Sequence, residues 1–560
     1  MVTQILELPE KIVPADVLVV GGGSAGCMAA IKAKDADPAL KVVVMEKAGL
    51  SRSGAITMGM DALNVVAIPG VASPEDYVES MATACEGILD PDLCRVEAER
   101  SFAVLKELEA WGVHFPRDDS GRYRVHQVHA KGSFLVEMEA PDLKKVLARQ
   151  VARRGIEVLE RTMATRLLAE GGAVNGAIGL DTRSGELVVC PAKATILTTG
   201  CAGRFGLPKS GYLYGTYEFP GNAGDGYSMA YRAGAELTGF EYLQILPLIK
   251  DFNGPSLYVA QVRGARVVNA LGERVGGSLG EKEMVAMKAI YHETRADRAP
   301  IYLDMTHLPE ERIREIEAVM FGSERPTRRE FFKARGIDFR RDQVELHITE
   351  PYLCGGHGLT GVVINTEAET SLKGLYASGD VAAVPWQYLT GALVFGAIAG
   401  RNAAKHAATR QTPAVNQDTI QAERERLLRH LAAEDGIKPH VFEYKLRRIV
   451  NDYIAPPKSE RKLKTALWWI ARFRRDLPRV QAQDLHELMR TAELYCILDC
   501  AELSARASLE RRESRWGLAH YRIDHPERDD ENWLKHVILR RDPDTGEMTV
   551  TTRPITAEAR

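Results

Sequence analysis

Short runs of apolar residues mark the strands expected in the N-terminal part of the chain. Asp16–Val20 and Lys41–Glu46 are two such runs, and a segment rich in alanine and glycine, long enough for a helix, separates them. Valine-rich runs without polar alternation are typical of parallel strands buried on both faces. The pattern therefore predicts one strand–turn–helix–strand unit over residues 16–46.

Two later segments have the same apolar character. Ala192–Gly200 is an apolar run that ends in glycine, and Gly374–Asp380 is another that ends in Gly-Asp. A helix-like segment, Ala392–Arg410, follows shortly afterwards. Strands this far apart can share one sheet only if the domain is discontinuous, so we expect an insertion over 246–349, where charged and turn-forming residues increase.

Beyond residue 411 the pattern is helical and strongly charged, and the last thirty residues return to strand character at Val537–Arg541 and Met548–Thr552. These patterns predict an α/β (α+β) fold. Its expected parts are a Rossmann-like nucleotide-binding domain over 1–245 and 350–410, a capping domain over 246–349, a helical domain over 411–530 and a strand segment over 531–560.

The turn inside the first unit carries the clearest chemical signal. Gly21, Gly23 and Gly26 form a G-x-G-x-x-G fingerprint, and Glu46 ends the next strand twenty residues after Gly26. With this spacing a pyrophosphate can sit on the helix N-terminus while the acidic side chain binds a ribose. The alternative, a tight turn without a ligand, leaves Glu46 unexplained. The sequence thus predicts a dinucleotide site.

Composition limits the remaining classes. A chain of 560 residues should form about three or four domains. The net charge of −3 gives no sign of nucleic-acid binding. Met1–Val13 lacks the apolar core of a signal peptide, and no apolar run reaches the roughly 18 residues needed to span a bilayer. We expect a cytoplasmic protein without a membrane span.

The eight cysteines form no C-x-x-C pair and no iron–sulfur run. We therefore expect reduced thiols and no metal site. Cys496 and Cys500 share a helix face, and core packing is the interpretation we favour for them. Any iron–sulfur centre that this protein uses must lie on another chain.

Charged segments near the C-terminus carry the most specific match to a known family. Arg512–Arg522 and Pro526–His536 would, taken alone, be read as a solvated face. Together with Gly224–Gly226, Ile301–Asp304 and Gly374–Asp380 they follow one family pattern in order. The chain resembles the flavoprotein subunits of the fumarate reductase and succinate dehydrogenase superfamily, which includes L-aspartate oxidase and the adenylylsulfate (APS) reductase alpha subunit.

This resemblance implies a Rossmann-like FAD-binding domain. Glu46 would bind the adenosine ribose and Asp380 the ribityl chain, with Ser53 near the isoalloxazine. Covalently flavinylated members carry a histidine after the Arg-Ser pair, but Gly54 stands there, which implies non-covalent FAD. The residues expected to bind FAD are Gly21, Gly23, Ser24, Ala25, Gly26, Glu46, Lys47, Ser53, Gly54, Thr199, Gly200, Asp225, Gly379 and Asp380.

The same comparison argues against a dicarboxylate substrate. Where dicarboxylate enzymes of the family place a histidine or an arginine, this chain has Leu246, Pro351 and Tyr388. The catalytic arginine of the family's capping domain aligns near Glu283 or Met284. Losing one hydrogen bond to a charged group costs on the order of 1.5–3 kcal/mol. Succinate and fumarate are therefore not expected as natural substrates.

The APS reductase alpha subunit is the better local match. Arg52–Ala55, Asn269–Glu273 and Thr349–Tyr352 resemble it, and His357 and Asn64 match residues near the reactive edge of its flavin. That family stacks a tryptophan on the adenine of its substrate. An ungapped alignment places Val259 there, with Tyr258 or Trp386 as the available substitutes, so adenylylsulfate itself stays open.

The leading hypothesis is an FAD-dependent oxidoreductase acting on a small anion, with sulfur-containing anions first, and exchanging single electrons with a ferredoxin-like iron–sulfur partner. His357 would be a general acid or base, and Arg266 or Arg263 would attract the anion. The alternative is a dehydrogenase, reductase or oxidase of an uncharged or monocarboxylate substrate, of the fumarate reductase/L-aspartate oxidase type. A third hypothesis is a catalytically idle scaffold or electron-relay protein.

Overall fold

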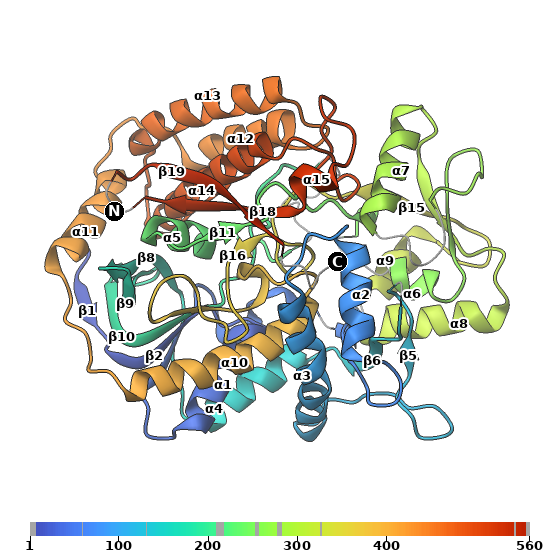
Figure 1. Cartoon of the computed structure of the whole chain (residues 1–560), viewed down its shortest axis with the longest axis horizontal. Coiled ribbons are helices and arrows are strands. Elements are labelled where there is room, and N and C mark those ends of the chain that lie inside the picture. Colours follow the sequence, from blue (N-terminus) through green and yellow to red (C-terminus); the bar gives the residue numbers. More distant parts are fainter. Residues whose placement is uncertain are drawn as a thin grey trace.

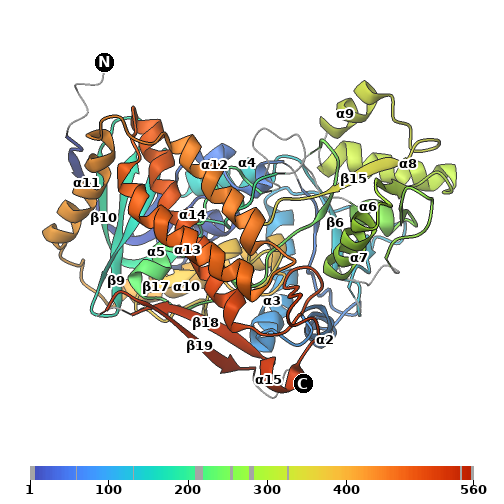
Figure 2. The ribbon, with the colours of Figure 1, turned by 90° about the horizontal axis from the view of Figure 1, so that it is seen from above.

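The computed structural model has the expected mixed α/β architecture, with sheets and helices in several layers (Figures 1 and 2). It describes residues 7–58, 60–129, 131–208, 218–252, 257–276, 283–324, 327–542 and 545–555.

An eight-stranded sheet forms the base of the nucleotide-binding part. Both strands of the predicted unit, β2 (Ala15–Val20) and β3 (Val42–Met45), lie in its parallel portion. β17 (Leu375–Ala377) and β2 flank the same parallel strand, β10 (Leu187–Leu197), so distant segments share one sheet. The other strands of this sheet are β1 (Glu10–Ile12), β7 (Glu157–Leu159), β8 (Thr162–Glu170) and β9 (Ala173–Asp181).

Helices α1 (Ser24–Ala36) and α10 (Tyr388–Ala408) cover one face of this sheet and pack against each other (Figure 1). A Cβ atom at Gly396 would lie 2.6 Å from the carbonyl oxygen of Ala25. Only glycine therefore allows the two helix backbones to approach this closely. The contact brings the segment after β17 against the first strand–helix turn. α4 (Leu143–Arg153) packs beside α1.

The inserted capping part lies to the right in Figure 1 and carries its own antiparallel sheet, in the order β12-β15-β14-β13. Its first and last strands, β12 and β15, pair with each other, so the insertion begins and ends at the same place. Its elements are β12 (Pro247–Ile249), α6 (Leu257–Gln261), β13 (Arg266–Val268), α7 (Glu283–Arg295), β14 (Ile301–Asp304), α8 (Glu310–Ala318), α9 (Thr327–Arg335) and β15 (Val344–Ile348).

Two smaller sheets complete the framework. The three-stranded sheet consists of β4 (Met60–Leu63), β6 (Leu135–Ala140) and β5 (Val125–His126), with α2 (Pro74–Ala84) and α3 (Pro91–Ala110) as the neighbouring helices in the chain. The other has the order β16 (Gly361–Val362), β11 (Leu237–Thr238), β18 (Lys535–Arg541) and β19 (Met548–Pro554), and α5 (Asp225–Ala233) precedes β11.

Four long helices form the expected C-terminal helical layer (Figure 2). They are α11 (Gln417–Leu431), α12 (Pro439–Ile449), α13 (Glu460–Asp476) and α14 (Leu485–Glu510), and the short α15 (Asp530–Trp533) follows. The charged segment after α14 is buried, so the interpretation as a solvated face is wrong. Glu513 accepts hydrogen bonds from Arg511 and Arg515 at 2.8 and 2.6 Å, and none of these side chains reaches the surface.

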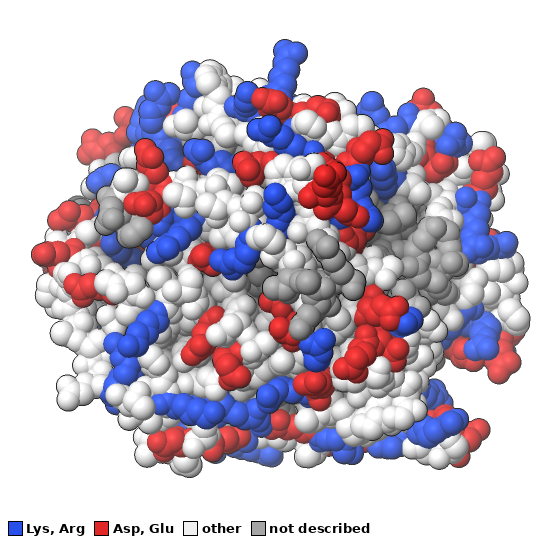
Figure 3. Space-filling view, viewed as in Figure 1, with Lys and Arg blue, Asp and Glu red and all other residues white. Residues whose placement is uncertain are grey.

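Basic and acidic side chains are interspersed on the face shown in Figure 3, which fits the small net charge. Among the described residues, no helix combines the length and the apolar character needed to cross a bilayer.

Candidate active site

The glycine turn lies between the end of β2 and the start of α1, as the spacing predicts. Gly21 has a φ of +101°, and a Cβ atom there would lie 2.5 Å from the carbonyl oxygen of Thr198. A Cβ atom at Gly26 would lie 1.9 Å from the carbonyl oxygen of Gly21. A Cβ atom at Gly23 meets no protein atom within 4 Å. Packing therefore requires the first and third glycines, whereas the second borders open space.

The N-terminus of α1 has the features of an anion site. Gly23 is its N-cap, no side chain caps it, and its first turn holds no acidic residue. The first backbone N–H groups, including those of Ser24 and Ala25, have no partner within the helix and carry the positive end of its dipole. The buried ammonium group of Lys144 donates to the carbonyl oxygen of Gly22 and adds positive charge beside the turn. Sequence reasoning missed this lysine because no motif includes it.

Glu46 lies against the same turn. Its Oε2 accepts a hydrogen bond from the Gly22 amide at 2.6 Å, and its Oε1 accepts one from the Ala48 amide at 2.8 Å. A carboxylate offers about four lone-pair sites, so two remain for further donors. The carboxylate is thus oriented at the end of β3 with capacity for ribose hydroxyls.

Lys47 points elsewhere. Its ammonium group donates to Asp225 Oδ2 at 2.6 Å and to Glu493 Oε1 at 2.8 Å. Burial would by itself raise the pKa of Glu493, but Arg204 and Lys47 beside it lower that pKa to about 2. Burial raises the pKa of Asp225. These contacts join the start of α5 and the long helix α14 to the end of β3.

Several remaining candidates gather around the turn. A Cβ atom at Gly54 would lie 3.1 Å from the Cα atom of Gly23, and one at Gly379 would lie 2.9 Å from the Cβ atom of Ala25. Thr199 Oγ1 and Ser53 Oγ are buried and form no hydrogen bond in the described structure. Buried hydroxyls are normally hydrogen-bonded. The open side of Gly23 and these two hydroxyls therefore fit a polar ligand such as FAD.

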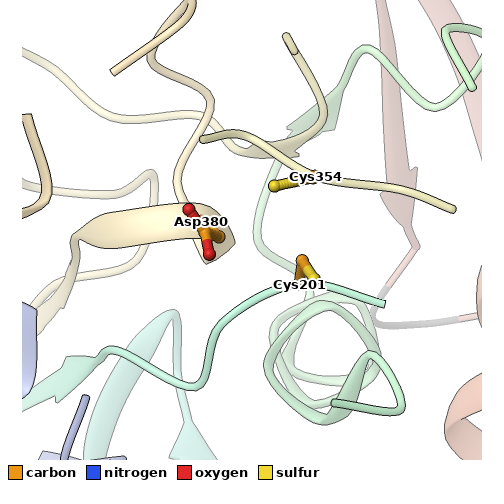
Figure 4. A group of neighbouring side chains, drawn as sticks. All are labelled: Cys201, Cys354 and Asp380. Atoms are coloured by element: carbon orange, nitrogen blue, oxygen red, sulfur yellow. The ribbon is translucent and has the colours of Figure 1, made fainter. Parts of the chain in front are cut away.

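The next feature is a buried cluster of a histidine, two carboxylates and two thiols near the end of β17. Glu218 Oε1 lies 3.1 Å from His357 Nδ1, and Cys354 Sγ lies 4.0 Å from the same nitrogen. Cys201, Cys354 and Asp380 have their sulfur and oxygen atoms within 4.8 Å of one another (Figure 4). Sequence analysis identified His357 and Asp380, but it carried no signal for Glu218 or for the pairing of the cysteines.

Burial and charge shift the pKa values in this cluster in different directions. Burial and the nearby Glu218 carboxylate raise the pKa of Asp380 to about 7. Burial would lower the pKa of His357, but its hydrogen bonds to Cys354 and Glu218 raise that pKa well above its usual value. Burial raises the pKa of Cys201 to about 11. The imidazole is therefore held in its cationic form beside a carboxyl group that titrates near neutrality.

An aromatic wall stands next to this cluster. Tyr388 and Trp386 have φ values of +47° and +50°, which side-chain-bearing residues rarely adopt. Their amides donate to the carbonyl oxygens of Gly356 and Gly358. The ring of Tyr388 lies 5.5 Å from that of His357. Such strain concentrates at functional sites. The side chain of Tyr258, the other expected substitute for the family's tryptophan, lies outside the described residues.

Asn64 and Arg266 are not brought into this cluster by any described contact. Asn64 follows β4, and its carbonyl oxygen lies 3.4 Å from His129 Nε2. Arg266 is on β13 of the capping sheet, half exposed, and pairs with Asp304 at 3.5 Å. Arg263 is buried and donates to Glu137 at 2.6 Å. The positions expected near the missing capping arginine have side chains outside the described residues.

The fold and the turn define a dinucleotide-binding α/β protein with a titratable cluster at the site. Comparisons with known proteins narrow this class. Residues 16–391 match a family model described as an FAD binding domain, and residues 443–560 match one described as fumarate reductase flavoprotein C-term. The chain therefore belongs to the FAD-binding flavoprotein family of fumarate reductase and succinate dehydrogenase, and it is an FAD-dependent oxidoreductase.

Individual relatives span the whole chain. One polypeptide of the fumarate reductase (CoM/CoB) from Methanothermobacter marburgensis is 28% identical, with 95% of this chain and 98% of that protein covered. Adenylylsulfate reductase from Archaeoglobus fulgidus is 26% identical and superimposes with a TM-score of 0.90, covering 99% and 97% of the two chains. Quinol fumarate reductase from E. coli, at 23% identity and a TM-score of 0.83 over 97% of each chain, shares the fold.

Proposed function

We propose that this chain is the flavin-bearing subunit of an enzyme that moves two electrons to or from a small anion, with sulfur-containing anions as the first candidates. The observation that carries the proposal is a single cationic histidine in an otherwise apolar and aromatic wall. Leu246, Trp386 and Cys354 belong to one buried apolar cluster, with Tyr388 packed against it. A dicarboxylate needs cationic or hydrogen-bonding groups for both of its ends.

The comparisons support sulfur chemistry without assigning it. A structure of adenosine-5-phosphosulfate reductase contains sulfite as a covalent adduct, and that chain superimposes on this one with a TM-score of 0.89 at 26% identity. A sulfur oxyanion carries its charge on one compact group, which one imidazolium and a few hydrogen bonds can hold.

FAD supplies two-electron redox chemistry when it is bound. We assign its pyrophosphate to the Gly21–Gly26 turn and its ribose to Glu46, with Ser53 and Thr199 offering hydroxyls to the remainder. Lys47 would act indirectly, by holding Asp225 and Glu493 in place. Gly54 in place of the family's histidine predicts that FAD is held without a covalent bond.

His357 has two tasks in this proposal. Its positive charge attracts the anion, and its proton is available to an atom of the substrate during electron transfer. Glu218 keeps the imidazole cationic through its contact with Nδ1. Asp380 can exchange a proton near neutral pH, because its pKa is raised to about 7.

Anaerobic reoxidation of the reduced flavin tests the substrate class. Purified protein reduced by an artificial donor would be mixed with sulfite, adenylylsulfate, fumarate or a monocarboxylate while flavin absorbance is followed. We expect a sulfur compound to reoxidise the flavin, or in the reverse direction to reduce it, much faster than fumarate does. Rapid reoxidation by fumarate and none by sulfur compounds would overturn the assignment.

A second candidate is a dehydrogenase, reductase or oxidase of an uncharged or monocarboxylate compound. The apolar side chains Leu246 and Pro351 favour it, since they would exclude a second charged group from the substrate. Fast reoxidation of the reduced protein by air alone would support the oxidase form.

We also propose an iron–sulfur electron carrier as the partner, acting together with this chain in the cytoplasm. All eight cysteines are buried, and they are dispersed among distant elements. None is therefore placed to ligate an iron–sulfur cluster of the usual four-cysteine kind. Mixing the reduced protein with a low-potential ferredoxin and following cluster absorbance tests this exchange.

A further inference from the structure

Cys201 and Cys354 are 153 positions apart in the sequence but face each other across two antiparallel segments. The neighbouring pair, Ala202 and Leu353, exchanges both of its backbone hydrogen bonds, at 2.9 and 3.4 Å. The cysteines therefore occupy the next, non-hydrogen-bonded position, where opposed Cα atoms lie about 4.5 Å apart. Disulfides bridge Cα separations of about 4.4–6.8 Å. The backbone register thus permits a cross-strand disulfide here.

The side chains agree with the backbone. Both sulfur atoms lie within 4.8 Å of each other and of an Asp380 oxygen (Figure 4). Asn222 Nδ2 lies 3.6 Å from Cys201 Sγ, and His357 Nδ1 lies 4.0 Å from Cys354 Sγ. A hydrogen-bond donor and a cation near sulfur favour the thiolate that forms during exchange. Asp380 can accept a proton from a thiol.

The pair also lies beside the proposed cofactor site. Cys201 directly follows Thr199 and Gly200, and Asp380 directly follows Gly379, which contacts the start of α1. Both thiols are almost fully buried. Burial raises their pKa values and keeps them from oxidants in bulk solvent, so a partner for electron exchange must itself lie inside the site.

We propose that Cys201 and Cys354 form a redox-active dithiol that exchanges two electrons with the flavin. The inference rests on the proposed function, which places FAD here. In the oxidising direction two S–H bonds break and one S–S bond forms. The two electrons and two protons pass to the oxidised flavin, with Asp380 and His357 as proton carriers. In the opposite direction, the reduced flavin returns them and restores both thiols.

Electron counting tests this on the holoenzyme. Anaerobic reductive titration of the oxidised protein should consume four electron equivalents per FAD, and two in the Cys201→Ala and Cys354→Ala variants. Cys190→Ala, a buried cysteine on β10, is the matched control and should still take four. Alkylation and mass mapping of the unmodified chain add a readout without any variant. The oxidised form should lack two of its eight thiols and contain a peptide joining Cys201 to Cys354.

Two results would overturn the dithiol. One is uptake of two electrons per FAD with all eight thiols retained in glutathione buffers of every potential tested. The other is a stoichiometric Zn²⁺ in the purified protein that is lost on Cys201→Ala, which would make the cysteines metal ligands. Neither result affects reoxidation of the flavin by anions, so failure of the dithiol and failure of the proposed function remain distinguishable.

Discussion

Alanine at Gly23 would alter the ligand side of the glycine turn while leaving its packing intact. A Cβ atom there meets no protein atom within 4 Å, and the φ of −65° suits any L-residue. Alanine is a poorer N-cap than glycine, so the apoprotein should lose about 0.5–1 kcal/mol of unfolding free energy. The variant is therefore expected to fold.

FAD affinity should fall much further. If the pyrophosphate approaches the α1 N-terminus from the open side of Gly23, a methyl group there displaces it from at least one backbone N–H. A hydrogen bond to a charged group contributes about 1.5–3 kcal/mol. The dissociation constant should therefore rise roughly 10- to 150-fold.

Titration of the apoprotein with FAD, followed by quenching of flavin fluorescence, gives this constant, and thermal unfolding of the same apoprotein reports stability. Gly26→Ala is the contrasting variant, because its Cβ atom would lie 1.9 Å from the carbonyl oxygen of Gly21 and should prevent folding. A Gly23→Ala protein that folds and binds FAD as tightly as the unmodified chain would refute the proposed pyrophosphate position.

Further predictions concern buried charges. Glu493→Gln should cost about 3–5 kcal/mol of stability and lower the thermal midpoint, because it leaves the buried ammonium group of Lys47 partly uncompensated. Burial raises the pKa of Glu97 well above its usual value, so the native chain keeps a proton that the unfolded chain loses above about pH 4.3. Stability then falls as pH rises, and Glu97→Gln should gain stability relative to the unmodified chain between pH 5 and 8, measured by denaturant midpoints. Glu218→Gln removes the carboxylate that raises the pKa of His357, so the high-pH limb of the flavin reoxidation rate should move to lower pH.

Each of these has a direct control. Exposed ion pairs are worth little, so Glu460→Gln, whose partner is also exposed, should leave the thermal midpoint unchanged. A Glu97→Gln difference that is independent of pH would contradict the proposed titration. For Glu218→Gln, an unmoved pH profile with a lowered rate would indicate a purely structural role.

Local spacing carried most of the fold prediction. The first strand, the glycine turn and Glu46 lie within one short unit, where bond geometry and strand length fix their relative positions. The residues missed are those whose contacts depend on distant segments. Glu218 reaches His357 across 139 positions, and no local pattern marks either as a partner of the other. Sequence analysis also gave Lys47 to the cofactor, whereas tertiary packing directs it to Asp225 and Glu493.

The sequence by itself determined that a dinucleotide lies on the Gly21–Gly26 turn and, through its C-terminal motif, the family to which the chain belongs. Only the tertiary structure decided that this motif is buried and that Cys201 and Cys354 meet. Spacing along the chain specifies a turn because neighbouring residues are linked by covalent bonds. Strand register, in contrast, is set by how the whole core packs, and a shift of one residue would turn each side chain to the opposite face.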